Sequence, residues 1–241
     1  MSKTYTVASW EDAPHLSEEK KADLLASYPP HMRDARSKGR PQLGAGAIYP
    51  VPESEIEIAP FEIPLWWPRI YGMDVGWNRT AAVWGAVDNE QGVVVLYSEY
   101  YKGQAEPPIH AQGIRSRGTW IPGLIDPAAR GRGQKDGAVL FDDYMDLGLN
   151  LIQAQNPVES GILRVWEALS TGRLKVFTSL RNWLSEFRIY RRDEKGRVVN
   201  KNNHLMDATR YLIMDYDLAQ TPPVKDVPFH VGPTGRDETG Y

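Results

Sequence analysis

The chain contains no cysteine among its 241 residues. This absence excludes disulfide scaffolds, thiolate zinc sites and a cysteine nucleophile, and it agrees with a reducing compartment. No apolar run approaches the length that spans a bilayer, and the N-terminus lacks the hydrophobic segment of a signal peptide. Neither Gly-Lys-Ser nor Gly-Lys-Thr occurs, so this sequence has no phosphate-binding loop of the Walker A type. We therefore expect a protein with no membrane contact and no ATPase activity of its own.

The composition is that of an ordinary globular protein, with 41% hydrophobic and 24% charged residues. Its length allows one domain with a substantial core plus additional segments. The formal net charge is −3, whereas nucleic-acid-binding proteins often have a positive net charge. The net charge therefore argues mildly against binding of nucleic acid. The positive charges are nevertheless unevenly distributed, and their densest cluster comprises Arg188, Arg191, Arg192, Lys195, Arg197 and Lys201.

Three regions differ in pattern along the chain. Residues 1–60 are predicted to be a connector or the remnant of a preceding domain, with short helices at 20–27 and 30–39. Residues 61–217 carry the regular periodicity of a folded domain. Residues 218–241 contain four prolines and are predicted to be a flexible tail.

The central region begins with strand-forming sequence and then alternates. Segments 69–75, 80–87 and 93–101 predict a three-stranded antiparallel meander. After them, helices at 108–117, 136–147, 159–169, 180–190 and 204–216 alternate with strands at 120–125, 150–154 and 174–177, and a charged hairpin occupies 191–200. This order predicts an α/β fold with a mixed sheet, antiparallel and then parallel, flanked by helices.

Three aspartates are the candidate catalytic residues. Asp74 and Asp126 each end an apolar strand, and Asp207 lies in an otherwise apolar helical stretch. A carboxylate beside a buried strand is costly to desolvate unless a cation compensates it. If the first and fourth strands are neighbours and the last helix crosses the same sheet end, the three carboxylates could hold Mg²⁺ or Mn²⁺. Two such ions are suited to phosphodiester cleavage.

Each aspartate also has a structural interpretation when taken alone. Asp74 could cap the turn that follows it, and Asp126, which precedes Pro127, could start one. The metal-site hypothesis is the better one only for the three residues taken together.

Three stretches resemble the nuclease domain of the tailed-bacteriophage terminase large subunit. They are Ile70 to Gly76, Leu124 to Pro127, and the hairpin Tyr190 to Gly196 that leads into His204 to Tyr211. The resemblance covers roughly Trp67 to Tyr216. The segments Pro29–Arg33 and Gly46–Val51 also resemble the connector that follows the ATPase domain of that family.

This resemblance implies a ribonuclease H-like fold and an endonuclease that cuts concatemeric viral DNA during genome packaging. It implies that Asp74, Asp126 and Asp207 hold two Mg²⁺ or Mn²⁺ ions. The implied partners are double-stranded DNA, the portal and the small terminase subunit, and the implied location is the host cytoplasm during viral assembly. Because the family protein also has an N-terminal packaging ATPase, either this chain is an excised domain or the motor is a separate chain.

Several further residues have two interpretations each. The hairpin residues Arg191, Arg192, Lys195, Arg197 and Lys201 could contact DNA phosphates next to the Asp207 helix, or form a solvated turn. His204 could position a metal or water from the face that carries Asp207, although a helix cap is the preferred interpretation. Glu99 could be a fourth carboxylate, but a solvated strand end is preferred. Trp77 and Trp120 are predicted to be packing residues rather than stacking platforms.

Two other functions are compatible with the sequence. One is a junction resolvase or ribonuclease H, because the metal chemistry on this fold is shared. The other is a non-catalytic scaffold that contacts a portal or another packaging protein.

Overall fold

The computed structural model describes residues 9–10, 16–27, 37, 46–126 and 140–223. These residues form one seven-stranded sheet in the order β1-β7-β4-β3-β2-β5-β6. The strands are β1 (Glu57–Ile58), β2 (Arg69–Asp74), β3 (Thr80–Asp88), β4 (Val93–Lys102), β5 (Gly123–Ile125), β6 (Leu151–Gln153) and β7 (Leu174–Phe177). The helices are α1 (Glu18–Ser27), α3 (Glu53–Ile56), α4 (Pro107–Arg115), α5 (Leu140–Asp146), α6 (Val158–Ser170), α7 (Arg181–Ile189), α8 (His204–Met214) and the 3₁₀ turn η3 (Tyr216–Leu218).

The predicted fold class is confirmed by the strand directions. Strands β2, β3 and β4 pair antiparallel, whereas β5 and β6 continue parallel from β2, and β7 and β1 continue parallel from β4. Only β3 among the described strands therefore runs against the rest. The C-terminal ends of the other strands consequently share one edge of the sheet, and the two predicted carboxylate strands, β2 and β5, are direct neighbours.

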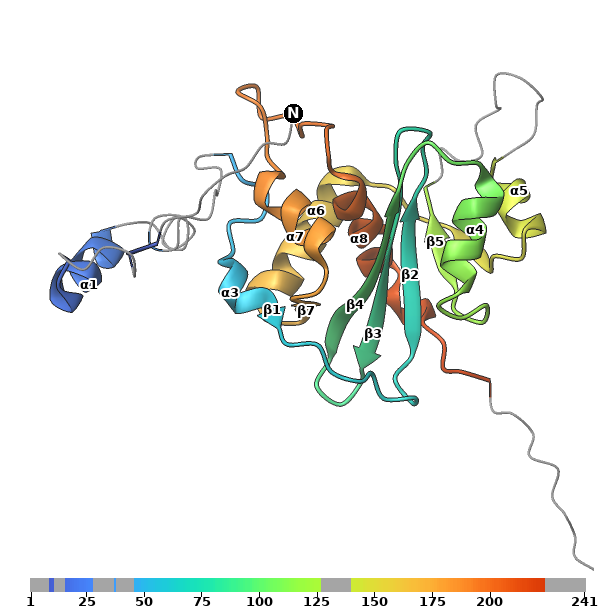
Figure 1. Ribbon diagram of the computed structural model, residues 1–241, viewed down its shortest axis with the longest axis horizontal. Helices are drawn as coiled ribbons and strands as arrows, with labels where there is room; N and C mark the ends of the chain where they lie inside the picture. Colours follow the sequence, from blue (N-terminus) through green and yellow to red (C-terminus); the bar gives the residue numbers. More distant parts are fainter. Residues whose placement is uncertain (1–8, 11–15, 28–36, 38–45, 127–139, 224–241) are drawn as a thin grey trace, which may run out of the picture.

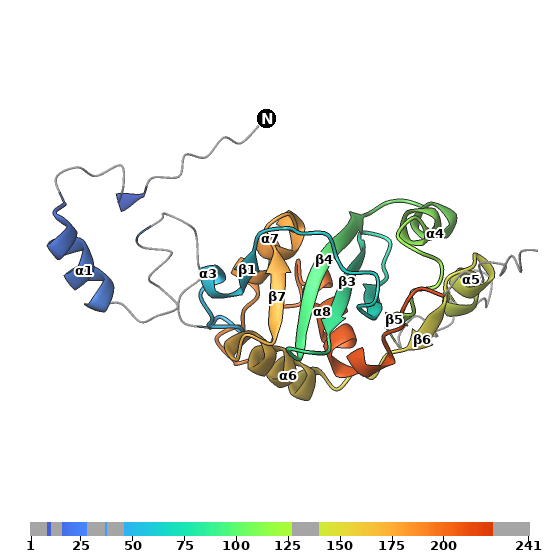
Figure 2. The same ribbon diagram turned by 90° about the horizontal axis from the view of Figure 1, so that it is seen from below.

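Helices cover both faces of the sheet (Figures 1 and 2). Helices α4 and α5 pack on one face around Tyr71, Met73 and Trp84. Helices α6, α7 and α8 pack on the other face over a larger core that includes Ile70, Val83 and the buried side of α8. Successive residues of a strand point to opposite faces, and Ile70 and Tyr71 on β2 accordingly belong to different cores.

Residues 47–58, which we expected in a connector, contribute to the fold. The side chains of Ile48, Tyr49, Val51 and Ile56 are buried in the larger core, and β1 adds an edge strand to β7. Glu53 is also buried and pairs with Arg188 of α7. At the other end of the domain, Gln220 pairs with Arg69 through two backbone hydrogen bonds of 2.7 and 3.0 Å.

The remaining predicted elements agree with the structure within a few residues, although β5 begins three residues later than predicted. The predicted helix at 30–39 and the first residues of the predicted helix at 136–147 lie outside the described residues. Within the described ranges, no helix combines the length and the apolar character that crossing a membrane requires.

Candidate functional site

Asp74 is the last residue of β2 and faces the helix α8. The alternation along β2 places Ile70, Gly72 and Asp74 on the same face of the sheet, and Ile70 belongs to the core under α8. The side chain of Asp74 is 15% exposed, so it lies where the sheet edge meets solvent.

Asp126 follows β5 directly and lies at the same sheet edge. Met73 of β2 is paired with Ile125 of β5, and the Asp126 amide donates to the Met73 carbonyl at 3.2 Å. The parallel pairing therefore brings Asp74 and Asp126, at the ends of the two strands, side by side. The predicted metal site depended on these two strands being neighbours.

Asp207 reaches this edge because α8 lies directly on the backbone of β2. A Cβ built on Gly72 would lie 1.9 Å from the carbonyl oxygen of Ala208, so the absence of a side chain at Gly72 permits the contact. Ala208 is the neighbour of Asp207 on the helix, and Asp74 is two residues beyond Gly72 on the same face of the strand. Close packing of helix on strand thus brings the third carboxylate to the first.

All three aspartates line one cavity of about 420 Å³. The cavity is open to solvent at the C-terminal edge of the sheet, and most of its lining is polar or charged. Its other lining residues come from the β2–β3 loop, the loop after β6 and the start of α6, the hairpin before α8, and α8 itself: Val75, Asn156, Val158, Val198, Asn200, Asn203, His204, Arg210 and Tyr211.

Two of the carboxylates have a basic side chain as a partner within the chain. His204 Nδ1 lies 2.7 Å from Asp74 Oδ2, and Arg210 Nη2 donates to Asp207 Oδ1 at 2.9 Å. In the described residues, no three His, Asp or Glu side chains are arranged as a ready-made metal-binding group. The donor set nevertheless fits a hard divalent cation, since three carboxylates and asparagine side chains line the cavity.

Neutral side chains complete these contacts. Asn203 Nδ2 donates to Asp207 Oδ2 at 2.7 Å, and Asn156 lies within 3.5 Å of Asp126 Oδ1 while its carbonyl accepts from Arg210. Both asparagines therefore contact an aspartate of the site, and Asn156 also links it to Arg210.

The electrostatics reflect how closely the three charges are grouped. Burial raises the pKa of Asp207, Arg210 opposes that change, and the charges of Asp74 and Asp126 raise the pKa further. The hydrogen bond to Asp74 raises the pKa of His204, against the effect of burial. Neighbouring carboxylates in one site make it less favourable for each of them to be ionised. A cation bound between them would therefore reduce their repulsion.

His204 does not cap α8, which corrects our preferred interpretation. It is the first residue of the helix and follows the N-cap residue Asn203, and its ring contacts Asp74. The first turn of α8 is closed instead by Glu186 of α7, whose Oε2 accepts from the Leu205 amide at 2.6 Å. Glu186 Oε1 also accepts from the Tyr101 hydroxyl at 2.7 Å.

Glu99 is neither a fourth ligand of this cavity nor a solvated strand end. Its carboxylate accepts from the amides of Asn182 and Trp183 at 3.0 and 2.9 Å. These amides belong to the first turn of α7 and have no partner within the helix, so Glu99 of β4 caps that helix from a position 83 residues away in sequence.

The predicted basic hairpin lies beside the cavity, but its cations differ in availability. Val198 and Asn200 of the hairpin line the cavity. Arg192 is held by Glu159 of α6 (2.6 Å) and Arg197 by Asp193 (3.1 Å). The remaining three are exposed and form no side-chain ion pair with another described residue: Arg191, Lys195 and Lys201.

The two tryptophans that were predicted to pack behave differently. Trp120 is partly buried and packs against the core under α4 and α5, as predicted. Trp77, in contrast, is 62% exposed, so its assignment as a packing residue is wrong.

Sequence reasoning missed Arg210, Asn156, Asn203 and Tyr211 as members of the cavity. Arg210 is 3% exposed, and a Cβ on Gly161 of α6 would collide with its stem, so the glycine makes room for it. Its spacing of three residues from Asp207 on one helix could have indicated the pair. The asparagines carried no such signal.

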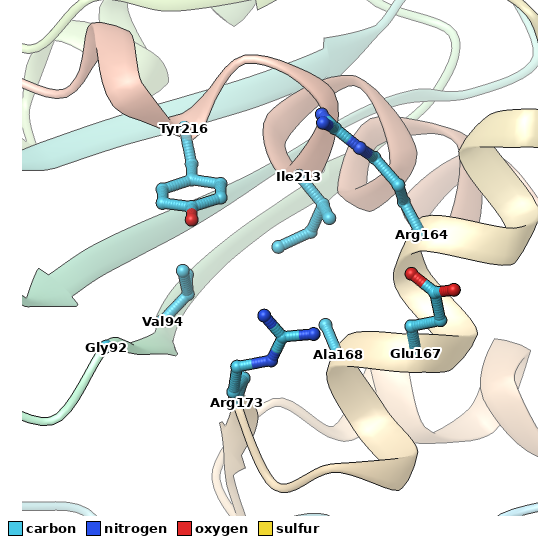
Figure 3. Close-up of a pocket in the computed structure, with 8 residues that line it drawn as sticks. All are labelled: Gly92, Val94, Arg164, Glu167, Ala168, Arg173, Ile213 and Tyr216. Atoms are coloured by element: carbon cyan, nitrogen blue, oxygen red, sulfur yellow. The ribbon is translucent and has the colours of Figure 1, made fainter.

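A second hollow, of about 210 Å³, lies at the opposite end of α8 (Figure 3). It is lined by Arg164, Arg173, Glu167 and Tyr216 among others, and by none of the three aspartates. Glu167 offsets part of the positive charge there, and Arg164 already donates to the Met214 carbonyl at 2.9 Å. The polar chemistry of the cavity at the other end is therefore the better candidate for function.

Comparison with known proteins identifies the family. The model of the terminase RNaseH-like domain matches residues 71–215. The large terminase subunit of Salmonella phage P22 is 32% identical over 242 residues, covering 93% of this chain and 48% of that protein. The chain thus spans about half the length of this curated relative.

Solved structures agree with the family match. The P22 large terminase nuclease domain superposes with a TM-score of 0.68 at 31% identity, over 74% of this chain and 96% of that one. The large terminase nuclease of the thermophilic phage G20c, solved with bound magnesium, has a TM-score of 0.52 at 12% identity, over 72% and 99%. The second likeness is one of fold alone. With its mixed sheet, its cavity at the strand ends and these matches, the chain belongs to the terminase ribonuclease H-like nuclease domain family.

Proposed function

We propose that this chain is a metal-dependent DNA endonuclease that cuts concatemeric viral DNA during genome packaging. The observation that carries the proposal is that Asp74, Asp126 and Asp207, distant in sequence, line one cavity of a terminase nuclease domain. The cavity is open at the sheet edge, so a phosphodiester of a bound strand can reach the carboxylates.

The three aspartates would hold Mg²⁺ or Mn²⁺, and their number and chemistry are compatible with two ions. Bound ions of this kind activate a water and stabilise the departing oxygen of the cleaved phosphodiester. Asn203 and Arg210 would keep the Asp207 carboxylate oriented from the helix side. His204 would act as an accessory group that orients Asp74 through their hydrogen bond.

The hairpin would contact the DNA backbone. Arg191, Lys195 and Lys201 carry the available charges, while Arg192 and Arg197 maintain the hairpin through their ion pairs. Phosphate contacts of this kind fix the position of DNA without reading its sequence. We therefore propose cleavage with little sequence preference.

The remaining family properties are proposals for this chain as well. They are a role with the portal and the small terminase subunit, and action in the host cytoplasm during viral assembly. The ATPase of the packaging motor would lie outside these 241 residues, since no Walker A motif occurs among them.

The test replaces each aspartate by asparagine, which preserves shape and removes charge. We expect D74N, D126N and D207N to lose Mn²⁺-dependent plasmid cleavage and to bind Mn²⁺ more weakly in calorimetry, with unchanged circular dichroism. Asp88→Asn is the matched control, because Asp88 ends the antiparallel strand β3 at the opposite sheet edge.

Two results would count against the proposal. Undiminished cleavage by any of the three variants would remove that residue from the metal site. A wild-type protein that binds no Mn²⁺ would instead support the alternative function of a non-catalytic packaging scaffold. A panel of linear duplex, four-way junction and RNA–DNA hybrid separates the proposed activity from that of a resolvase or ribonuclease H.

A further inference from the structure

Trp77 is a largely exposed tryptophan in the loop that follows the Asp74 strand. It is 62% exposed, whereas Trp84 and Trp183 are completely buried. Transferring a large apolar side chain out of water is favourable, and exposed aromatic rings are the groups on which proteins stack unpaired bases, so Trp77 is a candidate contact residue because of its place beside the cavity.

The loop that carries Trp77, residues 75–79 between β2 and β3, is held tightly by its neighbours. The Gln104 amide donates to the Trp77 carbonyl at 2.8 Å, and Thr80 Oγ1 donates to the Gly76 carbonyl at 3.2 Å. A Cβ on Gly103 would lie 2.0 Å from the Asn78 carbonyl oxygen, so the two loops are in backbone contact. The backbone of Trp77 is therefore anchored while its indole remains in solvent.

This loop borders the carboxylate cavity. Trp77 follows Asp74 by three residues, so their Cα atoms are at most about 11 Å apart. The β2–β3 connection and the segment that leads into α8 lie at the same end of the sheet (Figure 1). Because successive nucleotides of one strand rise by about 3.4 Å, this Cα separation corresponds to at most about three nucleotides.

The neighbouring side chains favour a nucleic acid over an apolar partner. The Arg79 guanidinium lies 4.2 Å from the centre of the Tyr101 ring in the adjoining strand, and Lys102 is exposed next to it. Arg79 belongs to the same loop as Trp77, and Lys102 is paired with Thr80 at the end of that loop. Proteins that bind single strands combine cations for the phosphates with exposed aromatic rings for the bases.

We propose that Trp77 stacks on an unpaired base next to the phosphodiester held in the cavity. This inference rests on the proposed nuclease function and adds a substrate feature to it. The preferred DNA would have locally opened base pairs at the cut site, and the hairpin and the Trp77 loop would both contact the strand to be cut.

The test measures DNA binding, with Ca²⁺ in place of Mg²⁺ and a gel check that no cleavage occurs. Trp77→Ala is compared with Trp77→Phe on a plain duplex and on a duplex with an unpaired segment containing 2-aminopurine, whose fluorescence falls on stacking. Trp66→Ala is the matched control, because Trp66 is 72% exposed but precedes β2 at the opposite sheet edge.

We expect W77A to weaken binding of the unpaired substrate about 5- to 150-fold and to restore the 2-aminopurine fluorescence. W77F should retain most of the binding, and W66A should behave as wild type. Binding of the unpaired substrate by W77A within about twofold of wild type, or unchanged fluorescence, would overturn the proposal.

The outcomes also separate this inference from the proposed function. If the wild type cuts DNA and the aspartate variants do not, normal binding by W77A refutes only the role of Trp77. If the wild type binds no DNA at all, the nuclease proposal fails and the stacking proposal fails with it.

Discussion

Replacing Gly72 by alanine tests whether the contact between β2 and α8 positions the carboxylates that we propose to be catalytic. The added Cβ would lie 1.9 Å from the Ala208 carbonyl oxygen, and real Cβ atoms essentially never come closer than 3.0 Å to such an atom. The obstructing atom belongs to the helix backbone, so no side-chain rotation can relieve the clash. Helix and strand would have to separate by more than about 1 Å.

Two consequences follow from that displacement. Overpacking a well-packed core costs about 1–3 kcal/mol of the free energy of unfolding. Asp207, next to Ala208, would move away from Asp74, and a misplacement of about 1 Å can lower a rate about 100-fold. We therefore expect G72A to remain folded but to cleave plasmid DNA about 100-fold more slowly at saturating Mn²⁺.

Gly85→Ala is the matched control on the neighbouring strand β3. Its added Cβ would lie 3.1 Å from Leu212 Cδ1, the flexible end of a side chain of the same helix. We expect a loss of about 1 kcal/mol and near-normal cleavage. Denaturant unfolding and initial cleavage rates measure both variants, and wild-type cleavage by a folded G72A would refute the proposed link between this packing and the site.

Three further predictions concern capping, pH and DNA contact. Glu99→Ala should lower the free energy of unfolding by about 1 kcal/mol without changing Mn²⁺ binding; weaker Mn²⁺ binding would contradict its role as a cap. Burial raises the pKa of Glu186, so the stability that the protonated group contributes is present at low pH and lost as pH rises through the folded-state pKa. The stability of Glu186→Gln relative to wild type should therefore increase from about pH 4 to about pH 8 in denaturant titrations, and a difference that does not vary with pH would refute this. Lys195→Ala and Lys201→Ala should each reduce the salt dependence of DNA binding by about one phosphate contact; an unchanged slope would exclude that contact.

The sequence predicted most of the fold because its elements have strong periodicity. Strand-forming runs and turns define β2 to β4, and the apolar face of α7 appears as Leu180, Trp183, Leu184 and Phe187 in sequence and is buried in the structure. Strand β1 was missed because two residues are too few to show a period, and only pairing with β7 makes them a strand.

The three aspartates of the candidate site could be predicted from the sequence, whereas the residues that contact them could not. Asp74 and Asp126 lie at the ends of apolar strands, which is visible in the sequence. They lie close to each other because β2 and β5 pair in parallel. Asn156 lies in a loop without a pattern, and the role of Glu99 depends on a contact across 83 residues. The exposure of Trp77 could not be predicted either, since an apolar residue after a strand is equally compatible with packing.

The two carboxylates that close α7 and α8 have a consequence for how the domain assembles. Neither helix has a side-chain cap from its own N-cap residue, and their first turns are completed by Glu99 of β4 and Glu186 of α7. The first turns of both helices are therefore completed by contacts between elements and not by their own local sequence. Because α8 carries Asp207, the position of the third carboxylate is linked through Glu186 and Glu99 to α7 and to β4, on the side of the sheet away from β5.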